Sequence, residues 1–160
     1  MVIALLCAFI KHLSEGLCFP LSILKHISII NDNFQKIKNY IIELGHTVTH
    51  ENIEDQVFVI DNENLGIKNL VVGCAEPILI IEQYIFETKS GSNEMFRELL
   101  QKNRDIVHGA FVLNETGEKI IFRDTLQIEN LDQNELEGSI NSLTLLLSEY
   151  GNRLLEFSKV

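Results

Sequence analysis

The order of helical and extended segments after residue 31 constrains the fold of this chain more than any single motif. A helix is followed by strands, a second helix, more strands and a long closing helix. The closing helix has an apolar stripe in which steps of four and three alternate; it contains Leu136, Ile140, Leu143, Leu147, Tyr150, Leu154 and Phe157. This order predicts an α+β domain, α-β-β-β(β)-α-β-β-β-α, with an antiparallel sheet flanked by helices.

Local signals set the expected boundaries. Asn31 or Asp32 is a good N-cap for a helix beginning near Asn33, and Gly45 is expected to end that helix. Asn93 is expected to cap a second helix over Glu94–Ile106, with Phe96, Leu99, Leu100 and Asn103 on its inner side. Asp132 and Glu135 predict the start of the closing helix. We expect strands at Thr47–His50, Gln56–Asp61, Ile67–Cys74, Ile78–Glu87, Ala110–Leu113, Lys119–Phe122 and Asp124–Glu129.

The first thirty residues differ from the rest because they are apolar and nearly free of acidic side chains. A secretory signal needs a basic start, and here Val2–Ile10 follows Met1 directly. A membrane span needs about 20 apolar residues, and Lys11 and His12 interrupt this segment earlier. A packing helix is a further alternative. We favour an appended or wrongly assigned start, with residues 1–30 as an atypical extension and residues 31–160 as one domain.

Charge and cysteine usage limit the classes of partner. The net charge is −10, so the chain repels phosphate backbones and nucleic acid is not expected to bind. Basic or amphipathic protein segments fit better. The three cysteines, Cys7, Cys18 and Cys74, form no disulfide framework, which favours a reducing, cytoplasmic compartment.

Few residues suggest catalysis. His46 and His50 are four apart, as zinc ligands can be on a helix, but they flank a β-favouring run and are expected on a surface strand. Cys74 lacks an adjacent base in the sequence and is expected to be buried and structural. The sequence therefore predicts no catalytic residue, no metal site and no cofactor.

The candidate partner-binding residues lie on the predicted sheet and second helix. Arg97 and Arg104 are seven apart and are expected on one helical face, as surface charges or recognition residues. Arg123 is expected to pair with an acid on a neighbouring strand or with a partner's carboxylate. Ile80 and Ile85 belong to an isoleucine-rich strand that is a candidate contact patch. The closing stripe packs on the sheet, serves a dimer interface, or does both.

Several segments carry a family resemblance: Asn33–Ile37, Gly66–Leu70, Pro77–Gln83, Leu100–Arg104, His108–Phe111, Phe122–Leu126 and Glu129–Asp132. With these segments the chain resembles the YbjN-domain family and its type III secretion chaperone-like (Tir/CesT-chaperone-like) fold, over roughly residues 31–159. The resemblance implies a small acidic homodimer that holds an extended client segment against apolar patches without nucleotide. For YbjN-like proteins it implies regulatory or stress-related roles, and it supplies no catalytic residues.

The combined hypothesis is a non-enzymatic protein-binding module, chaperone-like or regulatory. It would bind an unidentified client by strand addition or in an apolar groove. A membrane-tethered or stress-related regulator and a small-ligand-binding protein are the alternatives, although a membrane location is not favoured.

Overall fold

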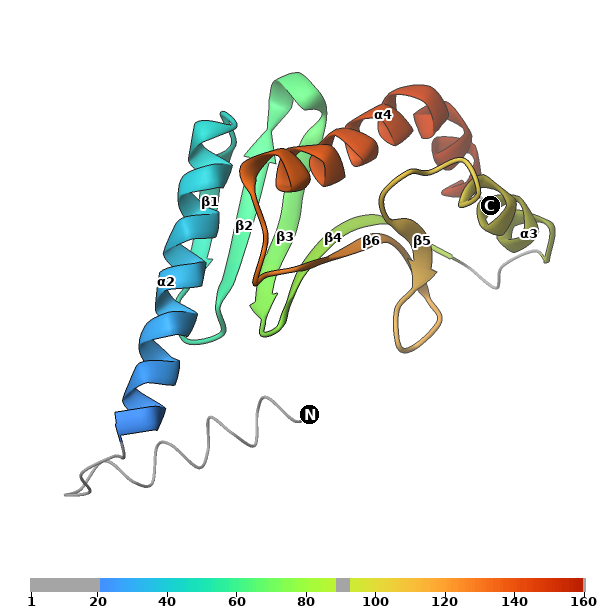
Figure 1. Ribbon diagram of the computed structural model, residues 1–160. Helices are drawn as coiled ribbons and strands as arrows, with labels where there is room; N and C mark the ends of the chain where they lie inside the picture. The colour runs from blue at the N-terminus through green and yellow to red at the C-terminus, as the bar shows by residue number, and fades with distance from the viewer. Residues whose placement is uncertain (1–20, 89–92, 160) are drawn as a thin grey trace. The chain divides into compact units, whose positions relative to one another are not determined.

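The computed structural model describes residues 21–88 and 93–159, with side chains from Asp32 onward. The chain divides into two compact units, Met1–Asp32 and Asn33–Val160. The second unit contains the sheet and helices shown in Figure 1, and the description below concerns this unit. Residues 1–30, predicted to be an atypical extension, lie outside the residues whose side chains are described.

The first described helix, α2, spans Leu21–Glu43, so the predicted start near Asn33 was wrong. Asn31 and Asp32 lie inside the helix because their unfavourable propensity costs only a few tenths of a kcal/mol. Its end is as predicted. Gly45 has φ 79°, and the His46 N–H donates to the Ile41 carbonyl at 3.1 Å.

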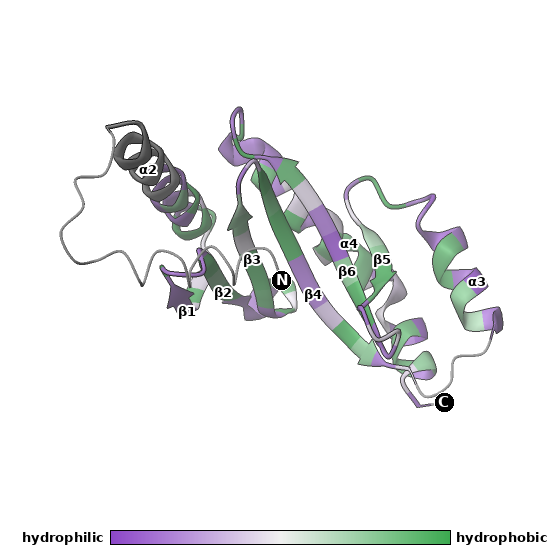
Figure 2. Ribbon diagram, turned by 90° about the horizontal axis from the view of Figure 1, so that it is seen from below, coloured by the Kyte–Doolittle hydropathy of each residue, from purple (hydrophilic) through white to green (hydrophobic). Residues whose placement is uncertain are grey.

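One antiparallel sheet contains all six described strands, in the spatial order β1-β2-β3-β4-β6-β5. The strands are β1 (Thr47–Asn52), β2 (Val57–Asn62), β3 (Ile67–Ala75), β4 (Ile78–Glu87), β5 (Ala110–Leu113) and β6 (Lys119–Gln127), with a short 3₁₀ turn, η1 (Glu63–Leu65), before β3. The predicted α+β class with a helix-flanked antiparallel sheet is confirmed. Figure 2 shows that the edge strand β1 is largely hydrophilic.

The strand β6 replaces two predicted strands. We expected a break at Arg123 and Asp124, but the strand continues through both residues. Each charge has a partner: Arg123 pairs with Glu82 of β4, and Asp124 accepts a hydrogen bond from the Ser139 hydroxyl at 2.6 Å. Satisfied charges remove the physical reason for a break.

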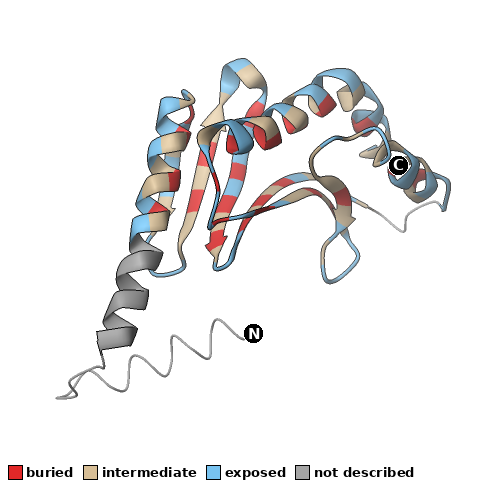
Figure 3. Cartoon of the chain, in the orientation of Figure 1, coloured by how far each residue is buried: buried red, intermediate tan, exposed pale blue. Residues whose placement is uncertain are grey.

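Helices cover one face of the sheet. The core joins α2, the strands and the closing helix α4 (Gln133–Phe157), and Figure 3 shows how buried positions recur along the strands and on these helices. Phe34 of α2 stacks on Phe58 of β2, with ring centroids 4.0 Å apart. The predicted cap of α4 is confirmed, because the Asp132 side chain accepts from the Glu135 N–H at 2.8 Å.

The helix α3 (Asn93–Lys102) is shorter than predicted. Asn103 lies beyond its end and bonds the backbone of Phe111 twice, donating to the carbonyl at 3.2 Å and accepting from the N–H at 2.8 Å. The Asn103 side chain therefore takes the place of a neighbouring strand at Phe111 of β5. Met95 and Leu99 are buried, whereas Leu100, predicted to face inward, is 67% exposed.

Candidate partner-binding surface

The second face of the sheet carries apolar side chains that do not pack against the core. Successive strand residues point to opposite faces, and the buried residues Phe58, Val72 and Ile81 belong to the helix-covered face. Their strand neighbours belong to the other face, which we call the uncovered face. Its apolar members are Val57, Val59, Val71, Ile78, Ile80, Tyr84, Val112 and Ile121.

Cross-strand pairing places these side chains next to one another. Val59 lies opposite Val71, Gly73 opposite Ile80, and Tyr84 opposite Ile121. Half-exposed Tyr84 (51%) is the most accessible of the large ones. Side chains directly opposite each other in an antiparallel pair are in contact range. They form apolar clusters on this face, beside Glu82 opposite Val71 and Thr125 opposite Ile80.

An ion pair between β4 and β6 lies within this face. Arg123 of β6 is directly opposite Glu82 of β4, and the Arg123 Nη1 donates to the Glu82 Oε1. The prediction that Arg123 pairs with an acid on a neighbouring strand is confirmed. The pair is partly exposed, with the Arg123 side chain at 39% and that of Glu82 at 31%.

The two candidate isoleucines fall in different environments. Ile80 is half-buried on the uncovered face, opposite Thr125. Ile85 lies at an irregularity in the pairing of β4 with β6, between Tyr84 and Phe86, and packs against the core cluster. The structure therefore assigns Ile80, and not Ile85, to the uncovered face.

Arg97 and Arg104 do not share a helical face as predicted. Arg97 is on α3, whereas Arg104 lies in the turn after the helix ends at Lys102. Both are exposed, and neither takes part in an ion pair among the described residues. Whether either residue recognises a partner stays a prediction.

The residues with possible nucleophilic or metal chemistry are dispersed. His46 was expected on a surface strand, but it precedes β1 and is 6% exposed. It directly follows the turn at Leu44 and Gly45 that ends α2, and its N–H donates to the Ile41 carbonyl of that helix. Burial lowers the pKa of His46. Burial, with a smaller effect from Glu76, raises the pKa of Cys74 to about 12, which agrees with the expected structural role.

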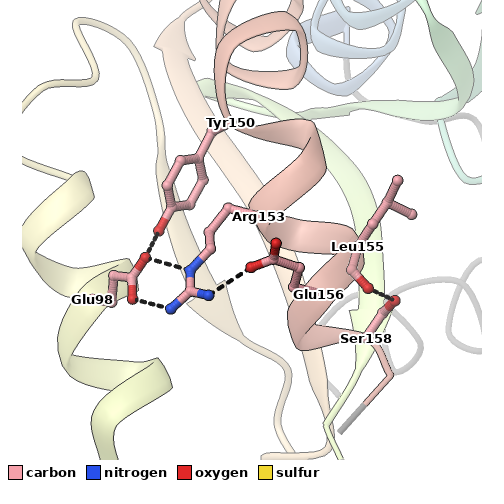
Figure 4. A network of polar contacts seen from close by, with 6 residues as sticks. All are labelled: Glu98, Tyr150, Arg153, Leu155, Glu156 and Ser158. Carbon is pink, nitrogen blue, oxygen red and sulfur yellow. Dashed lines mark hydrogen bonds and ion pairs between the residues drawn. The ribbon is translucent and has the colours of Figure 1, made fainter.

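A polar network that sequence reasoning missed joins α3 to α4 (Figure 4). The Glu98 carboxylate accepts from the Tyr150 hydroxyl at 2.6 Å and from the Arg153 Nε and Nη2 at 2.8 and 2.7 Å. These hydrogen bonds lower the pKa of Glu98 to about 2, and burial together with Glu98 raises that of Tyr150 to about 12. The partners are more than fifty residues apart, so no local pattern predicts them.

The described side chains contain no cluster of three or more potential metal ligands. Among the described helices, none has a stretch long and apolar enough to cross a membrane.

Solved structures of known proteins are similar to this chain. The crystal structure of YbjN from E. coli is similar with a TM-score of 0.58 at 10% identity, over 75% of this chain and 92% of that chain. An uncharacterized protein from Methanothermobacter thermautotrophicus has a TM-score of 0.52 at 13% identity. The match covers 79% of this chain and 99% of that chain. The Yersinia pestis type III secretion chaperone SycH, solved with a fragment of YscM2, has a TM-score of 0.48 at 15% identity. The match covers 81% of this chain and 99% of that chain.

No curated protein is significantly similar in sequence. A family model is matched by residues 30–160, which is most of the chain. The expected resemblance to YbjN and to the secretion-chaperone fold is confirmed. The chain belongs to the CesT_Tir_1 family.

Proposed function

We propose that this protein is a non-enzymatic, chaperone-like binding module that holds a segment of a partner protein on the uncovered face of its sheet. The observation that carries the proposal is the row of apolar side chains on β2, β3, β4 and β6 that no helix of the unit Asn33–Val160 covers. Contiguous exposed apolar surface of this kind commonly marks protein-interaction sites. Family membership supports the same class of function.

Charge favours one kind of partner segment. The chain carries a net charge of −10, so a segment with lysine or arginine beside its apolar residues would be attracted and oriented. The acidic partner Glu82 on the uncovered face is already engaged by Arg123, so specificity would come from the apolar side chains. We include a cytoplasmic location in the proposal, because the three cysteines of the sequence do not suggest a disulfide framework.

Affinity purification of the tagged full chain tests this proposal when matched variants are compared. Ile80→Lys and Val71→Lys each add a charge to the uncovered face. Leu100→Lys is the control, because Leu100 is an exposed leucine on α3. We expect one partner at near-stoichiometric yield with the wild type and Leu100→Lys, and at least about tenfold less with the sheet variants.

Equal recovery with all variants would show that the uncovered face is not the binding surface. Failure to recover any stoichiometric partner would count against the module itself. The family resemblance also implies a homodimer, and light scattering of the purified protein tests that expectation separately.

A further inference from the structure

The strands β3 and β4 separate at one end of the sheet. Their cross-strand pairs run from Ala75–Ile78 to Val71–Glu82, whereas β4 continues to Glu87 paired with β6. Asn69 has φ 55°, and the pairing of β4 with β6 is irregular near Ile85. Such irregularities bend strands. Figure 1 shows the start of β3 and the end of β4 diverging.

A cavity of about 450 Å³ lies where the strands diverge, and we call it the β3–β4 cleft. The last turns of α4 form another wall. The lining includes the apolar residues Ile85, Phe86, Leu147, Leu154 and Leu155 and the polar residues Ser148, Asn152 and Ser158. Its size and its mixture of apolar and polar groups are those of small-molecule sites in proteins. The one side chain in the lining that is charged at neutral pH belongs to Lys68, so a cationic ligand would be repelled.

Gln83, which lines the cleft, holds a buried hydrogen-bond acceptor in a fixed orientation. This lining residue is only 8% exposed. Its Nε2 donates to the Lys68 carbonyl at 2.9 Å and to the Tyr84 carbonyl at 3.0 Å. The amide cannot be reversed, because Oε1 would then face two carbonyl oxygens. Oε1 has no hydrogen-bond partner among the described residues, and a buried acceptor of this kind is unfavourable until a donor reaches it.

We propose that the β3–β4 cleft binds a small, neutral, mostly apolar molecule whose single N–H or O–H group donates a hydrogen bond to the Oε1 of Gln83. The apolar walls supply the burial, and the orphan acceptor selects for the donor. Lys68, the one charged lining residue, is exposed to solvent. Water therefore screens its charge, and burying an ionised ligand beside Gln83 is unfavourable. The site does not depend on Ile80 or Val71 of the uncovered face.

Binding requires a small displacement of the lining, because Oε1 is covered in the unliganded chain. Leu155 is the side chain suited to move, since it is 59% exposed. Figure 4 shows Leu155 on the side of α4 away from Arg153 and Glu98. Its movement therefore leaves the contact between α3 and α4 in place.

Two probes of nearly the same shape separate the hydrogen bond from simple apolar adsorption. Indole carries one N–H donor, whereas benzothiophene has sulfur at that position and no donor. Titration of the ¹⁵N-labelled full chain, followed by amide NMR shifts, is expected to show saturable binding of indole. Benzothiophene is expected to bind about tenfold more weakly, the usual effect of one lost hydrogen bond.

Three variants complete the test. Gln83→Met keeps the side-chain length but removes the acceptor. The variant is therefore expected to bind indole and benzothiophene with about equal affinity. Leu155→Trp fills the cleft and is expected to lower the affinity for indole at least about tenfold. Leu145→Trp, a similarly exposed leucine on α4 that lines a different cavity, is expected to bind indole as the wild type does.

Equal affinity of the two probes for the wild type would overturn the proposal, and so would the absence of saturable indole binding. Shifts centred on Val107 and Leu145 would also overturn it, because they would place the probe in the other cavity. If Gln83→Met does not fold, the comparison of Leu155→Trp with Leu145→Trp still decides the location. A negative result here leaves the partner-binding test of the uncovered face unaffected.

Discussion

Glu82 of β4 and Arg123 of β6 lie directly opposite each other and form an ion pair on the uncovered face of the sheet. Each charge therefore satisfies the other beside the apolar side chains of this face. A partner segment lying over this surface would meet a neutralised pair and not an isolated charge. This arrangement lowers the desolvation cost of covering the face.

Removal of this ion pair is expected to have a small effect on stability. Replacing Arg123 by Met should lower the free energy of unfolding by less than about 1 kcal/mol, because partly exposed pairs are screened by water. Urea denaturation at low and high salt measures the change, with Glu82→Gln as the matched variant. A loss above about 2 kcal/mol would contradict this account of the pair.

The network around Glu98 predicts an acid-dependent loss of stability. The folded-state pKa of Glu98 is lowered to about 2, first by hydrogen bonds from Arg153 and then by that from Tyr150. Its stabilising contribution is therefore complete above the ordinary pKa of 4.5 and is lost as the pH falls towards 2. Because the Glu98 side chain is 34% exposed, water screens these interactions. We therefore expect the network to contribute about 1 kcal/mol to the free energy of unfolding.

Urea unfolding between pH 7 and pH 2.5 checks this expectation. Glu98→Gln should flatten the acid dependence of the unfolding free energy. The control is Glu87→Gln, because Glu87 is largely exposed and lies 3.8 Å from the Lys119 Nζ. The prediction fails if both variants have the same acid profile as the wild type.

Two glycines with similar backbone angles are expected to respond differently to alanine. Gly109 has φ 80° and Gly117 has φ 74°. An added Cβ at Gly109 would lie 2.8 Å from the Phe122 Cε2, whereas at Gly117 it would meet nothing within 4 Å. Gly117→Ala should cost about 1 kcal/mol from backbone strain, and Gly109→Ala about 3 kcal/mol, because the core must also shift. Thermal or urea unfolding of the two variants gives the comparison.

The thiol of Cys74 is expected to be unreactive in the folded protein. Its pKa of about 12, raised by burial and by Glu76, leaves about a thousandfold less thiolate at neutral pH than an ordinary cysteine has. In a Cys7→Ser, Cys18→Ser background, labelling at pH 8 should be slow until urea unfolds the chain. Rapid labelling of the folded chain would identify an activated cysteine instead.

Strong local signals predicted much of the fold. The bounds of β4 match the predicted strand, because proline before it and a polar loop after it mark both ends. The cap at Asp132 was equally clear, since it depends on residues three apart. The start of α2 was wrong because Asn31 and Asp32 are good caps but are also tolerated inside a helix when the flanking residues favour one.

Features that depend on distant residues were not predictable. The strand β6 crosses Arg123 because Glu82, far away in sequence, neutralises the charge. The β3–β4 cleft arises from the left-handed backbone conformation of Asn69 and from the pairing irregularity at Ile85. No sequence pattern in either strand predicts these two features. The candidate surface was located only in part, since Ile80 lies on the uncovered face and Ile85 does not.

The position of β4 in the sheet has a consequence for synthesis of the chain. One edge of β4 pairs with β3, which has already been made, but the other edge waits for β6, which begins at Lys119. At translation rates of about 5–20 residues per second, an isoleucine-rich strand has an open edge for on the order of seconds. During that interval the open edge of β4 can pair with a strand of another nascent chain.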